Sequence, residues 1–485
     1  MNHAQTTQQI ISQSGIAFGT SGARGLVEQF TPQACAAFTT AFIYTLRQHQ
    51  PIHQLAIGID RRPSSPNIAA ACTAAAQATG VTVIDYGILP TPALALQAQH
   101  DRIPALMITG SHIPFDRNGI KFYRPEGEIS KADEQAILNA SAPLPPRAPH
   151  LEQPAQSERA QAGYLARYTQ WFTGKPLTGW RVGFYQHSAA GRELTLQILQ
   201  ALGAHTIPLG RSETFVPIDT EAVTEQDRTQ GPQWCKEHRL NALLTTDGDG
   251  DRPLLADENG HWLRGDLLGL LCARELGIDA LAVPINCNTA IEQSGAFRQI
   301  IRTRIGSPHV LAAMQQLLGQ HQRVAGFEAN GGFMLASTLH SQQRHLQPLP
   351  TRDALLPALT LMVSAARQNK PLSGLVNALP PRHTASDRLA NIPNENSRPL
   401  LSGWREDPAA MQQALTLPQP ITALDDTDGL RAHLANGDII HLRPSGNAPE
   451  LRCYAEASTP ARAQQLTTHC LHAIATILGC EGGGG

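Results

Sequence analysis

The chain has 485 residues, of which 41% are hydrophobic and 16% are charged, and its formal net charge is -2 at pH 7. A chain of this length and apolar content can form several hydrophobic cores, which excludes a small scaffold held together by disulfides. The charge balance gives no indication of binding to nucleic acid or to a membrane surface.

Eight cysteines lie far apart along the chain, without the paired spacing of a zinc site. We therefore expect reduced, mostly buried thiols and a cytoplasmic location. No apolar run approaches the roughly 18 residues that span a bilayer. The N-terminal sequence also lacks the basic start and apolar stretch of a signal peptide.

Strand and helix patterns alternate along the first three quarters of the chain. Apolar runs rich in β-branched residues predict strands at 55–59, 81–85, 105–109, 180–185, 241–246, 280–285, 299–303 and 323–326. Segments with helical periodicity lie between them, at 68–79, 131–139, 193–202 and 308–319. Ser64 or Ser65 can cap the first of these helices. Strands alternating with helices favour α/β domains with parallel sheets, repeated as three similar units.

The composition changes after about residue 375, where proline-rich stretches separate shorter patterns. Short strands are expected at 438–442 and 452–456, followed by a helix at 460–478. We predict a smaller α+β domain in this part of the chain. The expected domains are 1–150, 151–257, 258–375 and 376–485.

Three aspartates, Asp247, Asp249 and Asp251, alternate with glycines at the end of a predicted strand. Carboxylates so close together would be forced to take up protons unless a cation lay between them. Their oxygens suit Mg²⁺ or Ca²⁺. A calcium loop is an alternative because Glu258 is the twelfth residue counted from Asp247, but the sixth is Arg252 rather than glycine. A solvated turn without metal is the other alternative.

A serine, Ser111, follows a predicted buried strand and a glycine in the sequence Thr-Gly-Ser-His-Ile-Pro. An α/β protein presents reactive side chains at this position, where strands end at the edge of the sheet. His112 beside it and Lys121 shortly after it can give and take protons, which an arginine cannot do. A strand-to-loop turn without chemistry is the alternative for this segment taken alone.

Three further segments combine glycine with polar side chains. Residues 443–452 offer two arginines, a serine and an asparagine to a phosphate, and their prolines predict a loop. Residues 18–25 form a glycine-rich turn with Arg24, and a later turn presents Glu328 and Asn330 to sugar hydroxyls. A plain turn is the alternative for each segment. The glycine-rich motifs of nucleotide-binding proteins are absent from the sequence.

Taken in chain order, these five segments resemble the α-D-phosphohexomutase family, which includes the phosphomannomutases and phosphoglucomutases. They read FGTSGARG, TGSHIP with NGIKFY, DGDGDR, GFEANGG and RPSGNAPELR, and they extend from about residue 15 to about residue 457. The resemblance implies an α/β fold: three similar α/β domains with mixed sheets and a smaller α+β C-terminal domain around a central cleft. It also implies an isomerase-class phosphotransferase that interconverts hexose 1- and 6-phosphates through a phosphoserine and a bisphosphorylated sugar.

The resemblance further assigns roles to individual residues. Ser111 would carry the phosphate, and one Mg²⁺ would be bound by Ser111, Asp247, Asp249 and Asp251. The implied catalytic residues are Ser111, His112, Lys121, Arg24 and Arg252. The implied substrate-binding residues are Arg304, Glu328, Asn330, Arg443, Ser445, Gly446, Asn447 and Arg452. A hexose 1,6-bisphosphate would act as activator.

Three segments depart from the family pattern. Ile113 replaces an asparagine after the Ser-His pair, and Asn447 with the following alanine replaces Thr-Glu. The sugar loop lacks its usual serine and histidine, and Gly332 in place of the histidine is expected to open the pocket slightly. An Ala-Asn-Gly sequence after the glutamate is similar to that of the N-acetylglucosamine-phosphate mutases.

Mannose phosphate is the leading substrate, which predicts a phosphomannomutase. Glucose phosphate and glucosamine or N-acetylglucosamine phosphate are the alternatives. Outside this reaction, a metal-dependent phosphatase and a catalytically inactive sugar-phosphate-binding protein remain as alternatives. The expected partners are small sugar phosphates rather than nucleic acid or a membrane, and the expected assembly is a monomer or a homodimer.

Overall fold

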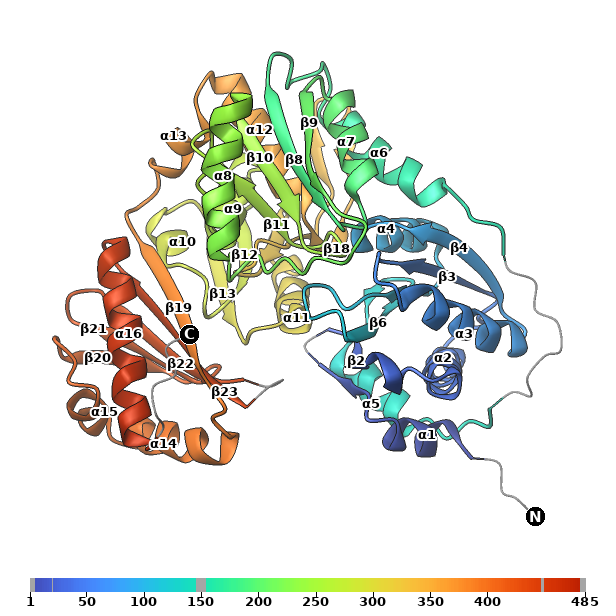
Figure 1. Cartoon of the computed structure of the whole chain (residues 1–485), viewed down its shortest axis with the longest axis horizontal. Coiled ribbons are helices and arrows are strands. Elements are labelled where there is room, and N and C mark those ends of the chain that lie inside the picture. The colour runs from blue at the N-terminus through green and yellow to red at the C-terminus, as the bar shows by residue number, and fades with distance from the viewer. Residues whose placement is uncertain (1–4, 20, 145–153, 446–448, 480–485) are drawn as a thin grey trace.

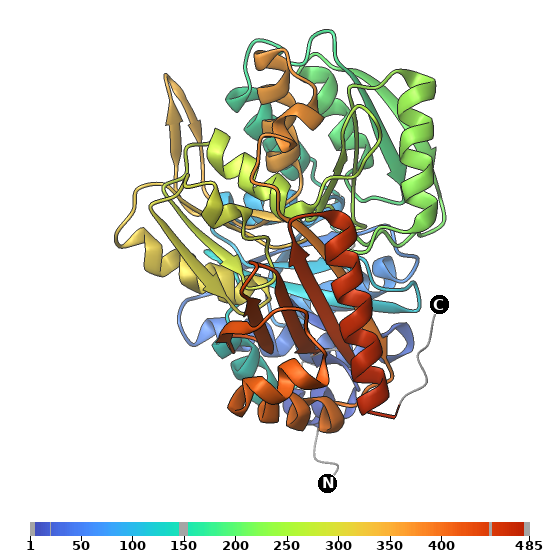
Figure 2. The same ribbon diagram turned by 90° about the vertical axis from the view of Figure 1, so that its left-hand side faces the viewer.

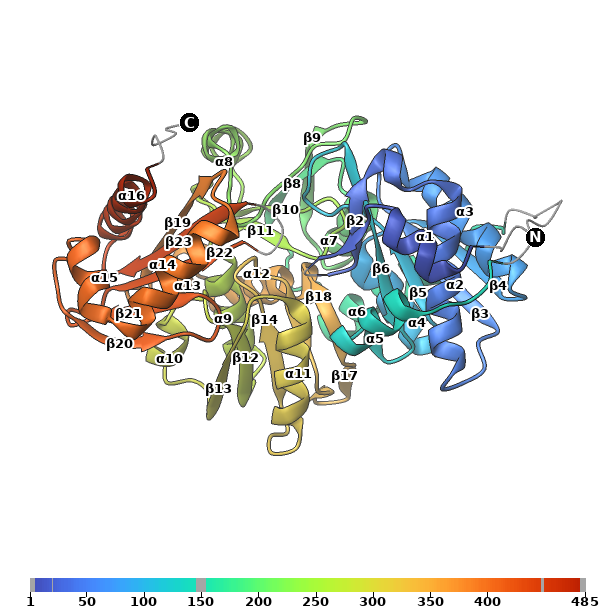
Figure 3. The same ribbon diagram turned by 90° about the horizontal axis from the view of Figure 1, so that it is seen from below.

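The computed structural model describes residues 5–19, 21–144, 154–445 and 449–479. Within them, four main β-sheets follow one another along the chain (Figure 1). Figures 1 and 3 show the sheets in an arc, with the first (blue) at the right and the last (red) at the left. In Figure 2 the last sheet and its long helix lie in front of the other sheets.

The first sheet has seven strands in the order β1-β2-β6-β5-β3-β4, with β7 paired to β6. Its strands are β1 (Ala17–Phe18), β2 (Ala23–Leu26), β3 (Gln54–Ile59), β4 (Thr82–Ile88), β5 (Ala105–Ile108), β6 (Arg117–Arg124) and β7 (Gly127–Glu128). The helices around it are α1 (Thr7–Gln13), η1 (Val27–Gln29), α2 (Pro32–Arg47), α3 (Ser65–Ala78), α4 (Thr91–Asp101) and α5 (Lys131–Asn139). β3 runs parallel to β4 and β5, whereas β6 runs antiparallel to β5 and β2.

The second sheet has four strands in the order β11-β10-β8-β9. They are β8 (Arg181–His187), β9 (His205–Arg211), β10 (Ala242–Thr246) and β11 (Pro253–Ala256). The helices of this part are α6 (Arg159–Trp171), α7 (Arg192–Ala201) and α8 (Glu225–His238). Every residue of β10 is buried, as expected of a central strand that is covered on both faces.

The third sheet has five strands in the order β13-β12-β14-β15-β18. They are β12 (Ala280–Pro284), β13 (Gln299–Thr303), β14 (Val324–Phe327), β15 (Phe333–Leu335) and β18 (Leu349–Asp353). A separate hairpin pairs β16 (Leu339–Ser341) with β17 (Arg344–Leu346). The helices are α9 (Gly265–Glu275), α10 (Ala290–Gln293), α11 (Ser307–Leu318), α12 (Leu355–Gln368) and α13 (Leu372–Val376).

The fourth sheet is antiparallel throughout, in the order β19-β23-β22-β21-β20. Its strands are β19 (His383–Ala390), β20 (Ile421–Asp425), β21 (Leu430–Leu434), β22 (Ile439–Pro444) and β23 (Glu450–Ala457). Helix α16 (Pro460–Ile477) packs against β19 and β23, and α14 (Asn394–Glu406) and α15 (Pro408–Ala414) precede β20. This is the α+β part that the sequence predicts.

The predicted strands and helices are present, with ends that differ by a few residues. The expectation of parallel sheets is only partly right, because each of the first three sheets also contains antiparallel strands, as the family resemblance implies. The Ser64 hydroxyl does not cap α3 but accepts a hydrogen bond from Asn118 Nδ2 at 2.8 Å. The four sheets fall within the four expected segments, and the domain boundaries themselves stay a prediction.

The hydrophobic side chains form one large cluster that runs through the first three sheets and a separate cluster under the fourth. A further cluster fills the other face of the first sheet. The seven cysteines among the described residues are free and buried, and Cys480 lies outside those residues. In the described part of the chain, no helix has both the length and the apolar character required to cross a bilayer.

Candidate active site

Ser111 lies in a tight turn after β5, next to the second sheet. Its backbone is left-handed, with φ of 53°, which is uncommon for a residue other than glycine and persists only where the surroundings hold it. The backbone N–H of Ser111 donates to Thr109 Oγ1 at 2.8 Å. Its hydroxyl donates to Asp247 Oδ2 at 2.6 Å, so the predicted serine and the first predicted aspartate are in direct contact.

The loop that carries Ser111 is held by Arg62, which follows β3 and is almost completely buried. Arg62 Nη2 donates to the carbonyl oxygens of Ser111 and Ile113, at 3.1 and 2.5 Å. Arg62 Nη1 donates to the carbonyl oxygens of Pro114 and Arg117, at 2.7 and 2.9 Å. One guanidinium group therefore binds four carbonyl groups of the serine loop.

Arg62 is itself held from two sides. Its Nε lies 3.3 Å from Asp60 Oδ2, and its guanidinium carbon lies 4.0 Å from the centre of the Phe215 ring. A Cβ atom at Gly110 would lie 2.5 Å from that guanidinium carbon, so only glycine fits directly before Ser111. The sequence analysis missed Arg62, because two arginines follow the strand and no local pattern shows which of them turns inward.

The three aspartates of the 247–251 turn lie together and are buried. One carboxylate oxygen from each lies within 4.8 Å of the others. One oxygen of Asp249 and one of Asp251 are buried without a hydrogen-bond partner among the described residues. Buried carboxylate oxygens without partners fit a bound cation, so this buried triad could hold a metal ion.

Two cationic side chains contact the same aspartates. Lys121 Nζ lies 2.6 Å from Asp249 Oδ2 and 2.6 Å from Asp251 Oδ2, and Arg352 Nη2 lies 2.9 Å from Asp251 Oδ2. Burial alone would raise the pKa of Asp251, but Arg352 and Lys121 outweigh it and lower that pKa. Burial and the neighbouring carboxylates raise the pKa of Asp247 well above its usual value. Burial would lower the pKa of Lys121, yet the two carboxylates raise it.

Arg252 and His112 lie on the other side of the serine. Arg252 Nη1 donates to His112 Nδ1 at 2.7 Å, and this ring nitrogen also lies 3.4 Å from Ser111 Oγ. Burial and the charge of Arg252 lower the pKa of His112 well below its usual value. Burial together with Arg252 and Arg352 lowers the pKa of Arg24 to about 10. Several positive charges therefore surround the serine, as a site for a phosphoryl group requires.

The sugar loop follows β14, and Glu328 in it accepts a hydrogen bond from Arg352 Nη1 at 2.7 Å. Asn330 Oδ1 accepts from the backbone N–H of Gly332 at 2.9 Å, which shapes the turn. The expectation that Gly332 opens the pocket is wrong. A Cβ atom at this position would lie 2.7 to 2.9 Å from the Arg352 side chain, so Arg352 fills the space.

The segment 443–452, predicted to be a loop that binds phosphate, belongs at both of its ends to paired strands. Arg443 in β22 and Arg452 in β23 are direct cross-strand partners, and β22 includes Pro444. A proline at the end of a strand leaves the pairing intact because few ladder bonds remain to be made there. Ser445 is buried, and its backbone N–H donates to the Glu450 carbonyl at 2.8 Å. Gly446 and Asn447 lie outside the described residues.

A cavity of about 420 Å³ lies between the pair His112 and Arg252 and the strand residue Arg452. Its lining includes His112, Glu221, Arg252, Arg388, Arg452 and Tyr454. His112 and Arg252 beside the serine and Arg452 of β23 therefore line the same cavity, which is large enough for a small ligand. Arg304 does not line this cavity: it is exposed, and its Nε donates to the Thr427 carbonyl of the fourth-sheet region at 3.1 Å.

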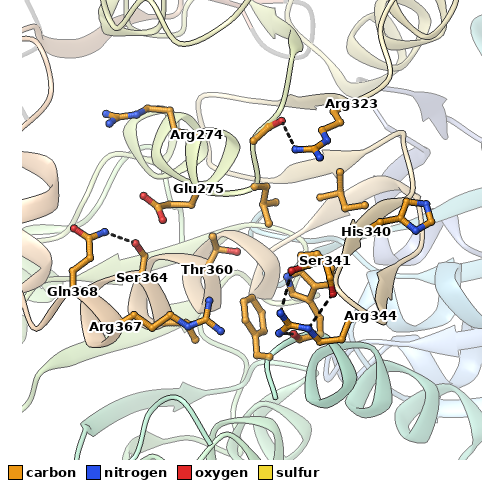
Figure 4. Close-up of a pocket in the computed structure, with 16 residues that line it drawn as sticks. Arg274, Glu275, Arg323, His340, Ser341, Arg344, Thr360, Ser364, Arg367 and Gln368 are labelled. Atoms are coloured by element: carbon orange, nitrogen blue, oxygen red, sulfur yellow. Dashed lines mark hydrogen bonds between the residues drawn. The ribbon is translucent and has the colours of Figure 1, made fainter. Parts of the chain in front are cut away.

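A second cavity of about 390 Å³ lies where α6, α9 and α12 end, beside the β16–β17 hairpin (Figure 4). Figure 4 shows Arg344 turned toward Ser341, whose carbonyl and hydroxyl oxygens accept its hydrogen bonds at 3.3 and 3.0 Å. None of the predicted site residues among the described ones lines this cavity. The candidate site residues that line a cavity therefore line the first one.

Comparisons with known proteins identify the family. Family models of phosphoglucomutase/phosphomannomutase match residues 15–143 (α/β/α domain I), 264–383 (α/β/α domain III) and 389–470 (C-terminal domain). A phosphomannomutase from Salmonella muenchen is 49% identical over 480 residues, which cover 99% of this chain and all of that protein. The chain belongs to the phosphoglucomutase/phosphomannomutase family.

Two further proteins extend the comparison. A phosphomannomutase from Sinorhizobium fredii is 43% identical and covers 93% of this chain and 97% of that protein. A family structure from Burkholderia thailandensis has a TM-score of 0.75 at 18% identity, covering 94% of this chain and 97% of that one, and it shows the fold alone. The chain is thus a phosphomannomutase-like phosphohexomutase, an isomerase-class phosphotransferase of carbohydrate metabolism.

Proposed function

We propose that this phosphohexomutase prefers mannose phosphates and transfers the phosphoryl group through Ser111. Transfer through Ser111 is supported most directly by the 2.6 Å contact between Ser111 Oγ and Asp247, in a site where two other aspartate oxygens lack partners among the described residues. The preference for mannose is supported by the similarity to phosphomannomutases. A phosphate on Ser111 would stand beside both the carboxylate triad and the surrounding arginines.

Asp247, Asp249 and Asp251 are the residues proposed to hold one Mg²⁺, with an oxygen of the phosphoserine as a further ligand. Their carboxylates are the hard oxygen ligands that Mg²⁺ prefers. When bound, the ion would offset the negative charge on the serine oxygen during transfer. Lys121 and Arg352 contact two of the three aspartates, and they partly balance the negative charge of the triad.

The reaction begins with Ser111 carrying a phosphoryl group. The free hydroxyl of a hexose 1- or 6-phosphate attacks the phosphorus, the bond from phosphorus to Ser111 Oγ breaks, and a hexose 1,6-bisphosphate forms. Lys121 and His112 are the proposed carriers of the hydroxyl proton. Arg24 and Arg252 would stabilise the charge on the moving group. The bisphosphate then turns end for end and returns its other phosphoryl group to Ser111.

The far phosphate of the substrate needs a second binding site. Arg443, Ser445 and Arg452 are proposed to hold it, with Gly446 and Asn447 of the same segment and Arg304 from the third sheet. Two arginines on paired strands can bind one phosphate with parallel N–H groups. Glu328 and Asn330 are proposed to bind the sugar hydroxyls. A hexose 1,6-bisphosphate is the proposed activator, and a cytoplasmic location and a monomeric or dimeric state stay predictions.

Assays with mannose, glucose and glucosamine phosphates test the choice of sugar. Mannose and glucose differ only at C2, and a site without a polar group directed at C2 would discriminate by only about 10–200-fold. We expect kcat/KM for the two sugars to differ by no more than roughly two orders of magnitude. Glu328→Gln, which keeps a polar partner for Arg352, should lower kcat/KM equally for both sugars. Asn330→Ala should change the ratio of the two kcat/KM values. A preference above roughly ten-thousandfold would contradict this expectation.

Arg62 offers a test of how the serine loop is held. Arg62→Met removes the donor of four carbonyl groups, so we expect kcat to fall about 100-fold, the effect expected of a roughly 1 Å displacement of reacting groups. KM should change much less, because Arg62 does not line the substrate cavity. Steady-state kinetics and thermal unfolding of the variant give both quantities.

Arg192→Met is the matched control for this prediction. Arg192 is also fully buried, and its Nη1 donates to the carbonyl oxygens of His187 and Ser212 at 2.9 and 2.7 Å. It should lose stability to a similar degree while keeping most of kcat. Equal falls in kcat for the two variants would show that Arg62 contributes only to folding.

A further inference from the structure

The loop between β9 and α8 brings a carboxylate to the substrate cavity. Thr220 anchors the loop: it is buried, and its hydroxyl donates to the backbone carbonyl of Asn330 in the sugar loop at 3.3 Å. Asp219 shapes the turn, since its Oδ1 accepts from the backbone N–H groups of Glu221 and Ala222, at 2.9 and 3.3 Å. One oxygen of Asp219 is therefore occupied within the turn, and Glu221 lines the cavity beside it.

Glu221 lies among the groups proposed to bind the two ends of the substrate. It lines the same 420 Å³ cavity as His112 and Arg252 on one side and Arg452 and Tyr454 on the other. Glu221 lies within the cleft and remains accessible to solvent, and in the part of the chain that the structure describes its carboxylate makes no hydrogen bond or ion pair that would occupy it. A carboxylate in such a position accepts hydrogen bonds from whatever fills the cavity.

The charged and titratable groups that act on Glu221 come from several elements. They are Asp219 in its own loop, Arg252 after the aspartate turn, Arg264 before α9 and Glu328 in the sugar loop. Burial within the cleft and the Asp219 carboxylate raise the pKa of Glu221, and Arg252 opposes them. Burial and, next to it, Glu221 raise the pKa of Tyr454, and Tyr454 with a smaller contribution from Glu221 raises the pKa of Arg452 against the effect of its burial. Glu221 thus acts on the sugar loop and on β23 at once.

We propose that Glu221 binds a ring hydroxyl of the hexose and thereby contributes to the choice between sugars. This inference rests on the proposed function. A hexose held at C1 and C6 presents three ring hydroxyls, and Glu328 has only one oxygen that Arg352 does not bind. Glu221 reaches the same ring from the second sheet and accepts the bond that Glu328 leaves unmade. An amino group at C2 would also be attracted, because the carboxylate has no ion pair of its own among the described residues.

The test compares Glu221→Gln and Glu221→Ala with the control Glu225→Gln. Glu225 is exposed in the first turn of α8, four residues further along the chain, and does not line the cavity. We expect Glu221→Gln to lower kcat/KM about tenfold, mainly through KM, and to shift the mannose-to-glucose ratio at least about fivefold. The fall in kcat/KM should be larger for glucosamine phosphate than for mannose or glucose phosphate, because the substitution removes the charge that attracts its amino group.

Intact-mass measurement of the phosphate on Ser111 separates this proposal from the function on which it rests. The phosphate should be unchanged in all three variants, since Glu221 does not contact Ser111. If kcat/KM of both Glu221 variants stays within about twofold of that of the unmodified protein for every sugar, as it should for the control, the role of Glu221 is overturned. Absence of turnover and of serine phosphate in the unmodified protein would instead overturn the proposed function.

Discussion

Ser111→Ala is expected to lower kcat by several orders of magnitude while the protein stays folded. Alanine has no oxygen to carry the phosphoryl group, so both halves of the reaction lose their intermediate. The fold should survive because the turn is held by Arg62 and Thr109, which bind the backbone of Ser111 and not its side chain. Coupled assays measure the loss, and intact-mass analysis should show phosphate on the unmodified protein and none on the variant.

Ser65→Ala is the control for this experiment. Ser65 is also buried, and its hydroxyl donates to Asp60 Oδ1 at 2.6 Å, the same length as the bond from Ser111 to Asp247. Ser65→Ala should lower the free energy of unfolding about as much as Ser111→Ala does, because one such hydrogen bond contributes about 1.5–3 kcal/mol. It should lower kcat by no more than about tenfold, because Ser111 can still carry its phosphate. Substantial activity of Ser111→Ala would mean that another residue carries the phosphate.

Removal of the metal is expected to have an effect of similar size. Exhaustive chelation should abolish turnover, and Mg²⁺ should restore it, because the buried triad would otherwise hold like charges at short range. Metal analysis should find one ion per chain. The unfolding temperature should rise with Mg²⁺, since a ligand that binds only the folded state stabilises it. Metal–oxygen distances of about 2.0–2.1 Å would indicate Mg²⁺, and about 2.3–2.6 Å would indicate Ca²⁺.

Asp249→Asn should lose both the bound ion and the rise in unfolding temperature. Asp257→Asn is the matched control, because Asp257 is also buried and its Oδ1 accepts from the backbone N–H groups of Asn259 and His261. This second variant should keep the metal. Activity that persists after chelation, or a metal bound away from the triad, would contradict the assignment.

The sequence predicted the elements well, and it singled out the serine and the three aspartates that the structure brings together, because both depend on local pattern. Periodicity and glycine-bearing turns are short-range features, and a strand that ends in a buried serine or in three aspartates can be recognised on its own. The mixed character of the sheets was less accessible, since a strand pattern does not show the direction of its partner. The role of each site residue stays a prediction.

Arg352 shows what local pattern cannot reveal. It contacts Asp251, which is 101 positions earlier in the chain, and Glu328, which belongs to another turn of the third sheet. Nothing near Arg352 in the sequence marks it as part of the site. The same side chain fills the space beside Gly332, so an expectation based on the missing histidine alone was wrong about the pocket. Arg62 and Glu221 were missed for the same reason.

The separate core of the fourth sheet has a consequence for how the protein unfolds. Its apolar side chains form their own cluster, and its connections to the third sheet include polar ones: Asn288 Nδ2 donates to the Arg382 carbonyl at 2.9 Å, and the Ile305 N–H donates to Asp428 Oδ2 at 3.0 Å. Water can replace such bonds at little cost, whereas a shared apolar core cannot be divided without exposing it. The part of the chain that forms the fourth sheet should therefore unfold as a cooperative unit of its own. Its amide hydrogens should exchange independently of those in the other three sheets.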